Sequence, residues 1–215
     1  MKTLVSVLAA VLLLAGGCGK TDRPKKPKAA KSAKIIRSAQ AEPLAKPFYQ
    51  GNFLEDRQAL AAAQGSLKAL PQFAGKDIRV YEHILFFGGV RPRIELAVQN
   101  PDRPAEADYY IYENGQWAAS GEAETPAGIQ STARTFLLDG IRFESAADIA
   151  AAWKQQAKAV GAVVSEPYHV AFRQLPPQRK RPAKRFWSVP MLEAVGAQYY
   201  LSFNEDGSRW EFKKQ

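Results

Sequence analysis

The chain is poor in the residues that build cross-linked and metal-bound proteins. It has one cysteine and two histidines among 215 residues, so an intrachain disulfide cannot form and little material exists for a zinc site. The patterns HExxH, CxxC, GxSxG, GxGxxG and the P-loop are all missing from the sequence. We therefore expect no metal ion, no cofactor and no enzymatic activity.

The remaining composition is that of an ordinary globular protein. Hydrophobic residues make up 46% of the chain and charged residues 24%, which excludes a mainly disordered chain, a collagen and a multi-span membrane protein. The length suffices for one domain of average size or for two small ones, with a core of useful size.

The first 17 residues have the layout of a secretory signal peptide. Lys2 supplies a positive charge, Leu4 to Leu14 form an apolar run of 11 residues, and small residues occupy positions 15–17. A helix needs about 20 apolar residues to span a bilayer. We therefore expect residues 1–17 to be a signal peptide and not a permanent membrane span.

The segment Leu14-Ala-Gly-Gly-Cys18 resembles the lipobox of bacterial lipoproteins. In that family the cysteine thiol receives a diacylglyceryl group, cleavage occurs just before it, and the new amino terminus is acylated. The resemblance covers the first 18 residues only, and it implies lipidation of Cys18 and a membrane anchor. Gly19 follows in place of the aspartate of inner-membrane members, which implies the outer membrane. The alternative is a plain signal peptide with Cys18 incidental.

Residues 18–47 are predicted to be a flexible linker, because they are rich in Lys, Pro and Ala and poor in apolar residues. Between Lys20 and Arg37, eight basic side chains face one acidic one, giving +7, whereas the part from Ser38 onward carries only +1. Beside a lipid anchor, such a run attracts anionic lipids. The alternative is a solvated spacer, and nucleic acid is not an expected partner of an exported chain.

The rest of the chain is predicted to be an α+β protein built from two similar units, at 48–125 and 126–215. Each unit would have a helix followed by an antiparallel meander. Three pairs of fragments resemble one another at offsets of 86, 90 and 93 residues: His83–Phe86 with His169–Phe172, Tyr109–Ile111 with Tyr199–Leu201, and Trp117 with Trp210. These offsets suggest an internal duplication. The two units would share one sheet or pack as two lobes.

Local patterns give the expected elements. Leucines and alanines at helical spacing predict a helix that ends before Pro71, and a second helix is expected from an N-cap at Ser145 to Gly161. Asn114-Gly115 predicts a two-residue hairpin turn. Residues 135–143 are predicted to form one more hairpin, with a turn at Asp139-Gly140.

A basic insertion is the most informative candidate site. The sequence places five basic residues close together and then an aromatic one: Arg179, Lys180, Arg181, Lys184, Arg185 and Trp187. Such a cationic loop suits an anionic lipid, an acidic glycan or an acidic envelope protein. The alternative is a solvated loop with no ligand.

The other candidate residues give weaker evidence of a functional site. His83 and His169 are expected to be ordinary strand residues, and the loop carboxylates Glu122 and Glu124 give no evidence of a cleft. The aromatic residues of the two meanders are expected to be partly core and partly an exposed sugar- or peptide-binding face: Tyr109, Tyr110, Tyr112, Trp117, Tyr199, Tyr200 and Trp210.

These observations give three functional hypotheses. The first is a lipid-anchored, non-enzymatic envelope protein that binds another envelope component. The second is a periplasmic inhibitor or chaperone-like module that binds a protein through its sheet; tandem helix-plus-sheet units resemble β-lactamase-inhibitory proteins in layout alone. The third is a cell-wall hydrolase. The sequence leaves the oligomeric state open.

Overall fold

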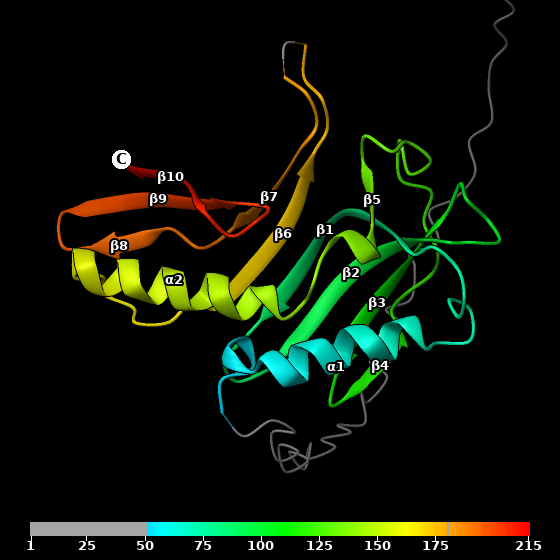
Figure 1. Ribbon diagram of the computed structural model, residues 1–215, viewed down its shortest axis with the longest axis horizontal. Helices are drawn as coiled ribbons and strands as arrows, with labels where there is room; N and C mark the ends of the chain where they lie inside the picture. The colour runs from blue at the N-terminus through cyan, green and yellow to red at the C-terminus, as the bar shows by residue number, and fades with distance from the viewer. Residues whose placement is uncertain (1–50, 180) are drawn as a thin grey trace, which may run out of the picture. The chain divides into compact units, whose positions relative to one another are not determined.

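The computed structural model describes residues 51–179 and 181–215. They form two α-helices and a ten-stranded antiparallel sheet (Figure 1), so the predicted α+β class is confirmed, with strands predominating. The expected signal peptide (1–17), Cys18 and the linker (18–47) lie outside the described residues, as does Lys180.

The first half of the described chain contains one α-helix and four strands, preceded by a short 3-10 helix. Their bounds are η1 Phe53–Glu55, α1 Arg57–Lys68, β1 Arg79–Phe87, β2 Arg93–Gln99, β3 Ala107–Glu113 and β4 Gln116–Ala119.

The second half contains the other α-helix and six strands. Their bounds are β5 Thr135–Leu137, η2 Leu138–Gly140, α2 Ser145–Val160, β6 His169–Leu175, β7 Lys184–Ser188, β8 Leu192–Ala194, β9 Ala197–Asn204 and β10 Arg209–Lys214.

A single sheet runs through both halves, in the order β10-β9-β7-β6-β1-β2-β3-β4. Strands β1 and β6 join the halves, with Leu85 opposite Ala171 at the middle of their paired segment. Of the two arrangements that the sequence left open, the structure therefore has the continuous sheet.

Both helices cover the same face of this sheet (Figure 1). Leu60 and Leu67 of α1 and Trp153 of α2 belong to one buried cluster with the strand residues Phe86 and Phe172. The helical spacing of apolar residues seen in the sequence therefore marks the core-facing stripes.

The ends of the helices follow from specific residues. Asp56 caps α1 by accepting a hydrogen bond from the backbone N–H of Ala59 at 2.9 Å. Gly161 ends α2 in the left-handed conformation, with φ 63°, as the sequence predicted. The expected N-cap at Ser145 is wrong, because Ser145 is already helical and the preceding Glu144 makes no side-chain cap.

The predicted hairpin at 135–143 is also wrong. Residues Thr135–Leu137 form β5, but they pair with Arg79–Tyr81 of β1, and residues 138–140 coil into η2. Residues 135–137 pair with the edge of the nine-residue strand β1 instead of with residues 141–143. This tertiary pairing overrides the local turn signal.

Strand β1 thus has two partners on one edge, β5 and then β6. A bulge at Glu82, which has φ 55°, separates the two pairings. The predicted Asn114-Gly115 turn is confirmed: both residues have positive φ, 54° and 80°, between β3 and β4.

Strands β3 and β9 lie at corresponding distances from the central β1–β6 pair, two strands outward from β1 and from β6. Counted outward from Leu85 and Ala171, the residue at the same place as Ile111 of β3 is Ser202 of β9, 91 positions later. The pairing thus aligns Tyr110 with Leu201, both buried. A shift of one residue exchanges the two faces of a strand. The offset of 90 would instead align buried Tyr110 with Tyr200, which lies on the other face of β9.

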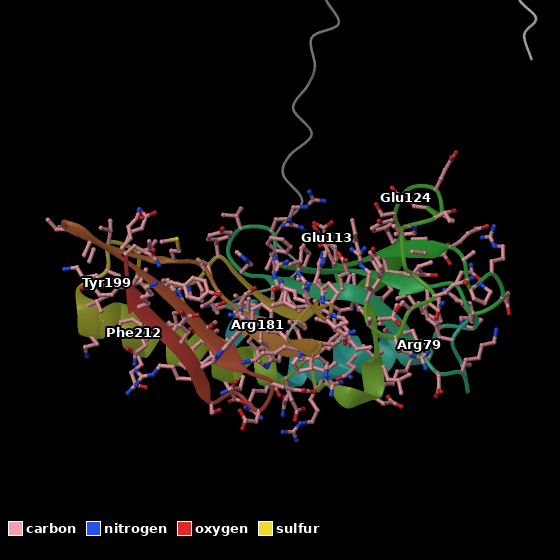
Figure 2. All side chains as sticks on the ribbon, turned by 90° about the horizontal axis from the view of Figure 1, so that it is seen from above. Arg79, Glu113, Glu124, Arg181, Tyr199 and Phe212 are labelled. Atoms are coloured by element: carbon pink, nitrogen blue, oxygen red, sulfur yellow. The ribbon has the colours of Figure 1, made fainter. Side chains whose placement is uncertain are left out.

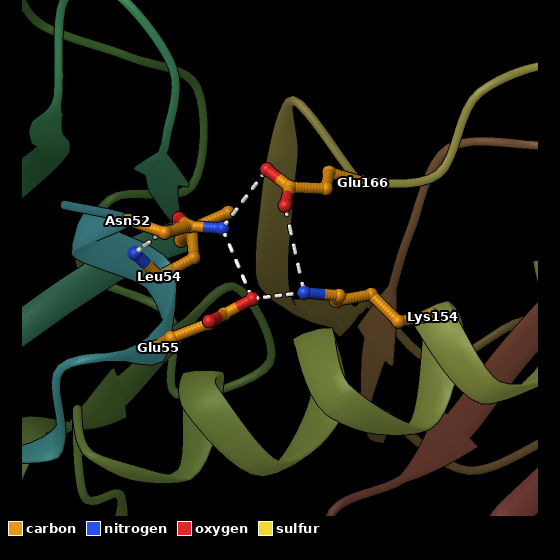
Figure 3. A network of polar contacts seen from close by, with 5 residues as sticks. All are labelled: Asn52, Leu54, Glu55, Lys154 and Glu166. Carbon is orange, nitrogen blue, oxygen red and sulfur yellow. Dashed lines mark hydrogen bonds and ion pairs between the residues drawn. The ribbon is translucent and has the colours of Figure 1, made fainter.

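A polar network attaches the start of the described chain to the second half (Figure 3). The Lys154 ammonium pairs with Glu55 and lies 3.5 Å from Glu166, and the Asn52 amide donates to Glu55 and Glu166 at 3.2 Å. These exposed pairs contribute little energy singly, but they place residue 52 beside the start of β6. The described chain therefore begins at that end of the sheet.

Candidate functional site

The face of the sheet opposite the helices, here called the open face, carries the candidate site. Because paired residues share a face, Leu85, Ala171 and Ser188 lie together on it. Among the described residues no helix packs against it. The segment between β4 and β5 covers one end, where Ile129 closes a small cluster with Tyr81.

The middle of the open face holds an arginine and two histidines. Arg173 of β6 is half-buried and donates from Nε to Ser188 Oγ at 2.8 Å, and it lies directly across from His83. Burial, followed by the charge of Arg173, lowers the pKa of both His83 and His169. No described carboxylate forms an ion pair with Arg173; Glu95, which pairs with Leu85 across the strands, offsets part of the lowering of the His83 pKa.

The predicted basic insertion is a protruding hairpin, here called the basic arm (described residues 176–179 and 181–183). It leaves the sheet where Leu175 of β6 pairs with Lys184 of β7, and the backbone groups of Gln178 and Arg181 bond to each other at 2.8 and 2.9 Å. Figure 1 shows the arm extending past the end of the sheet.

The structure separates the six predicted site residues. Arg179 and Arg181 are exposed on the arm, and no ion pair joins either to a carboxylate within residues 51–179 and 181–215. Arg185, at the base of the arm, pairs with Glu205 at 2.9 Å. Lys184 also lies at the base, with its ammonium over an aromatic ring.

Trp187 does not belong to the site. It is 1% exposed, packs against Phe172 with ring centroids 5.0 Å apart, and donates from Nε1 to the Glu205 carbonyl at 3.2 Å. The prediction that it lies beside the cationic tip is wrong. Its position in β7 turns the side chain to the helix-covered face.

Trp210 of β10 takes the place that the sequence gave to Trp187. It is 39% exposed, and Lys184 Nζ lies 3.0 Å from the centroid of its ring. The ring also meets Phe186 edge-on, with centroids 5.3 Å apart. Trp210 falls at a register shift between β9 and β10, which no sequence pattern revealed.

The base of the arm and Trp210 enclose a pocket of about 290 Å³. Its apolar lining comes from the arm, Leu175 and the Trp210 ring, and its polar groups include Arg181 and Lys184. Arg181 is labelled in Figure 2, where the molecule is seen from above. An apolar floor with a cationic rim can hold an amphiphilic anion.

The other aromatic candidates divide between core and surface. Tyr110 is buried, and Trp117 donates from Nε1 to the Ala63 carbonyl of α1 at 2.8 Å. Tyr112 packs against Trp117 at 5.2 Å. At the far edge of the sheet, Tyr199 stacks on Phe212 at 5.4 Å (both labelled in Figure 2). The seven residues therefore do not form one continuous recognition face.

The predicted loop carboxylates border a second pocket, of about 300 Å³, next to β3. Tyr109 Oη donates to Glu124 Oε2 at 3.1 Å, and burial with this contact raises the pKa of Tyr109. Glu122 and Glu95 also line this pocket. Across the part of the chain that the structure describes, no three His, Cys, Asp or Glu side chains gather as a metal site would require.

Neither helix within residues 51–179 and 181–215 is long and apolar enough to cross a membrane. Comparison with known proteins adds no relative: no protein-family model, no curated protein and no solved structure matches this chain.

Proposed function

We propose that this chain is a lipid-anchored protein of the bacterial cell envelope, in the outer membrane, that binds an anionic envelope component and catalyses no reaction. The observation that carries the binding role is the basic arm: Arg181 and Lys184 line an apolar pocket, Arg179 is exposed on the same arm, and no described carboxylate forms an ion pair with any of the three. Cations left unpaired beside an exposed tryptophan are typical of a surface that recognises an anion.

The electrostatic pattern of the rest of the domain supports this choice of site. Most other exposed cations have partners: Arg91 is bound to Glu113 by two hydrogen bonds, of 2.5 and 2.8 Å, and Lys76 pairs with Asp102 at 3.0 Å. Pairing inside the molecule reduces the attraction of a cation for an external anion. The arm keeps its charge available.

Labelling with radioactive palmitate tests the anchor. Cells producing the chain are expected to incorporate label into the wild type and not into Cys18→Ala. Equal labelling of both would remove the anchor from the proposal, while leaving the binding role of the arm to its own test.

Capture of envelope components by the full chain tests the arm. The variant Arg179→Gln/Arg181→Gln is expected to lose salt-sensitive capture, because attraction between exposed charges is screened by ions. The matched control is Lys213→Gln/Lys214→Gln, which removes the same charge from the exposed strand β10. Equal losses in the two variants would mean that net charge, and not the arm, accounts for binding.

The open face supports a second candidate, a module that binds an acidic protein. Arg173 has no ion pair with a described carboxylate there, and Tyr168 is 65% exposed, with its ring centroid 4.4 Å from that of His169. Arg93, which also pairs with Glu95 at 2.5 Å, lies 3.8 Å from the centroid of the Phe87 ring. Arginine and aromatic residues are enriched at protein interfaces. Cross-linking of a stoichiometric protein that is lost in Tyr168→Ala, and kept in the arm variant, would favour this candidate over the first.

We also propose that the two halves arose by duplication. Each has a helix followed by an antiparallel meander, and the middle of the β1–β6 pairing joins Leu85 to Ala171, the residue 86 positions later. That spacing equals the offset between the fragments at His83 and His169, which supports a two-fold relation between the halves. Related chains in which both halves align at the offsets of 86 and 91 would support it, and consistent alignment at other offsets would contradict it.

A further inference from the structure

We propose that the basic arm and Trp210 form a docking surface for the phosphate headgroups of an anionic phospholipid membrane. This inference rests on the proposed function and names the envelope component that the arm binds. Three properties of the arm carry it: few free backbone donors, an exposed apolar surface, and unpaired cations around that surface.

The backbone of the arm suits a poorly hydrated interface. Pro176, Pro177 and Pro182 have no N–H group, and the N–H groups of Gln178 and Arg181 are bonded to each other's carbonyls. Unsatisfied backbone donors are costly where water is scarce. Five of the seven described arm residues therefore bring no free donor to the interface.

The apolar surface is placed where it can contact lipid. Leu175 and Trp210 are each 39% exposed, and both line the pocket at the base of the arm. Tryptophan is favoured at the boundary between headgroups and hydrocarbon. The Lys184 ammonium over the Trp210 ring can turn to a phosphate while its aliphatic stem stays on the apolar surface.

The charges give the surface its preference for anionic lipid. Arg179 and Arg181 have forked guanidinium groups that bind phosphate oxygens in pairs. Each basic residue near an anionic leaflet strengthens binding about fivefold, so we expect removal of both arginines to weaken docking about 25-fold.

The experiment places the mature lipidated protein in vesicles whose phospholipid chains carry bromine, which quenches tryptophan fluorescence at short range. One set of vesicles contains phosphatidylcholine alone and the other also contains phosphatidylglycerol. We expect quenching of Trp210 in the anionic vesicles only, with Trp210→Phe giving the background from Trp117, Trp153 and Trp187. The fraction of Trp210 fluorescence that is quenched, followed during a salt titration, gives the equilibrium constant for docking.

Two variants decide the outcome. Arg179→Gln/Arg181→Gln is expected to lower the docking constant about 25-fold, and Lys213→Gln/Lys214→Gln is expected to leave it unchanged. Equal quenching in both kinds of vesicle, or equal effects of the two variants, would overturn the inference.

Failure of the proposed function gives a different result from failure of the inference. Protein that does not associate with phosphatidylcholine vesicles lacks the anchor. Anchored protein that shows no quenching in anionic vesicles, yet captures another envelope component through the arm, retains the proposed function and overturns the membrane docking alone.

Discussion

Two tryptophans with opposite environments give the sharpest test of the structure. Trp187 is 1% exposed and packs against Phe86 and Phe172, with centroids at 6.0 and 5.0 Å. Replacing it with alanine removes a large buried ring and leaves a cavity, so Trp187→Ala is expected to lower the free energy of unfolding by about 3–5 kcal/mol. Domains are commonly stable by only about 5–15 kcal/mol, so this loss would be severe.

Trp210→Ala is expected to cost less, about 1–2 kcal/mol, because the ring is 39% exposed and water can fill the space it leaves. Its main effect should be on ligand capture by the arm. Urea unfolding followed by circular dichroism, with linear extrapolation to water, measures both losses. A loss below about 1 kcal/mol for Trp187→Ala, or a larger loss for Trp210→Ala than for Trp187→Ala, would show that the assignment of β7 to the core is wrong.

Three further outcomes follow from single residues. Unfolding lets His83 and His169 regain the ordinary pKa of 6.5. The unfolded state then binds more protons, so the free energy of unfolding falls as the pH drops below 6.5. His83→Gln should weaken this pH dependence, as measured by urea titrations at several pH values. The Gln64 amide donates to the Ile141 carbonyl at 2.8 Å and accepts from the Phe143 N–H at 2.9 Å; Gln64→Leu should cost about 1–3 kcal/mol, and an unchanged urea midpoint would contradict the bridge. Gly161→Ala forces a side chain into φ 63° and should lower stability by about 1 kcal/mol, whereas the exposed helical Gly65→Ala should stabilise α1.

Local periodicity was enough to predict the helices and most strands. Leu60 and Leu67 belong to the apolar stripe of α1 and Trp153 to that of α2, and all three lie in the same core. Asn114-Gly115 specifies its own turn. Information of this kind is local, since a few neighbouring residues determine it.

Features that depend on distant pairing could not be predicted. Residues 135–137 pair with β1 and not with their neighbours. Period-2 patterns in a sequence also do not fix the register between strands. The candidate site suffered from the same limit. The basic arm was visible as a run of charge, but which tryptophan lies beside it depends on the strand faces of Trp187 and the register shift at Trp210.

The bulge at Glu82 determines where the sequence of this protein can vary without disturbing its interior. Because β5 occupies the edge of β1 beyond the bulge, β6 leaves that edge after Arg173, and its last residues pair with β7 alone. The described residues of the hairpin beyond them, 176–179 and 181–183, are exposed. The length and composition of this hairpin can therefore vary without disturbing the interior, so this position is a natural place for exchanging one recognition segment for another while the scaffold stays the same.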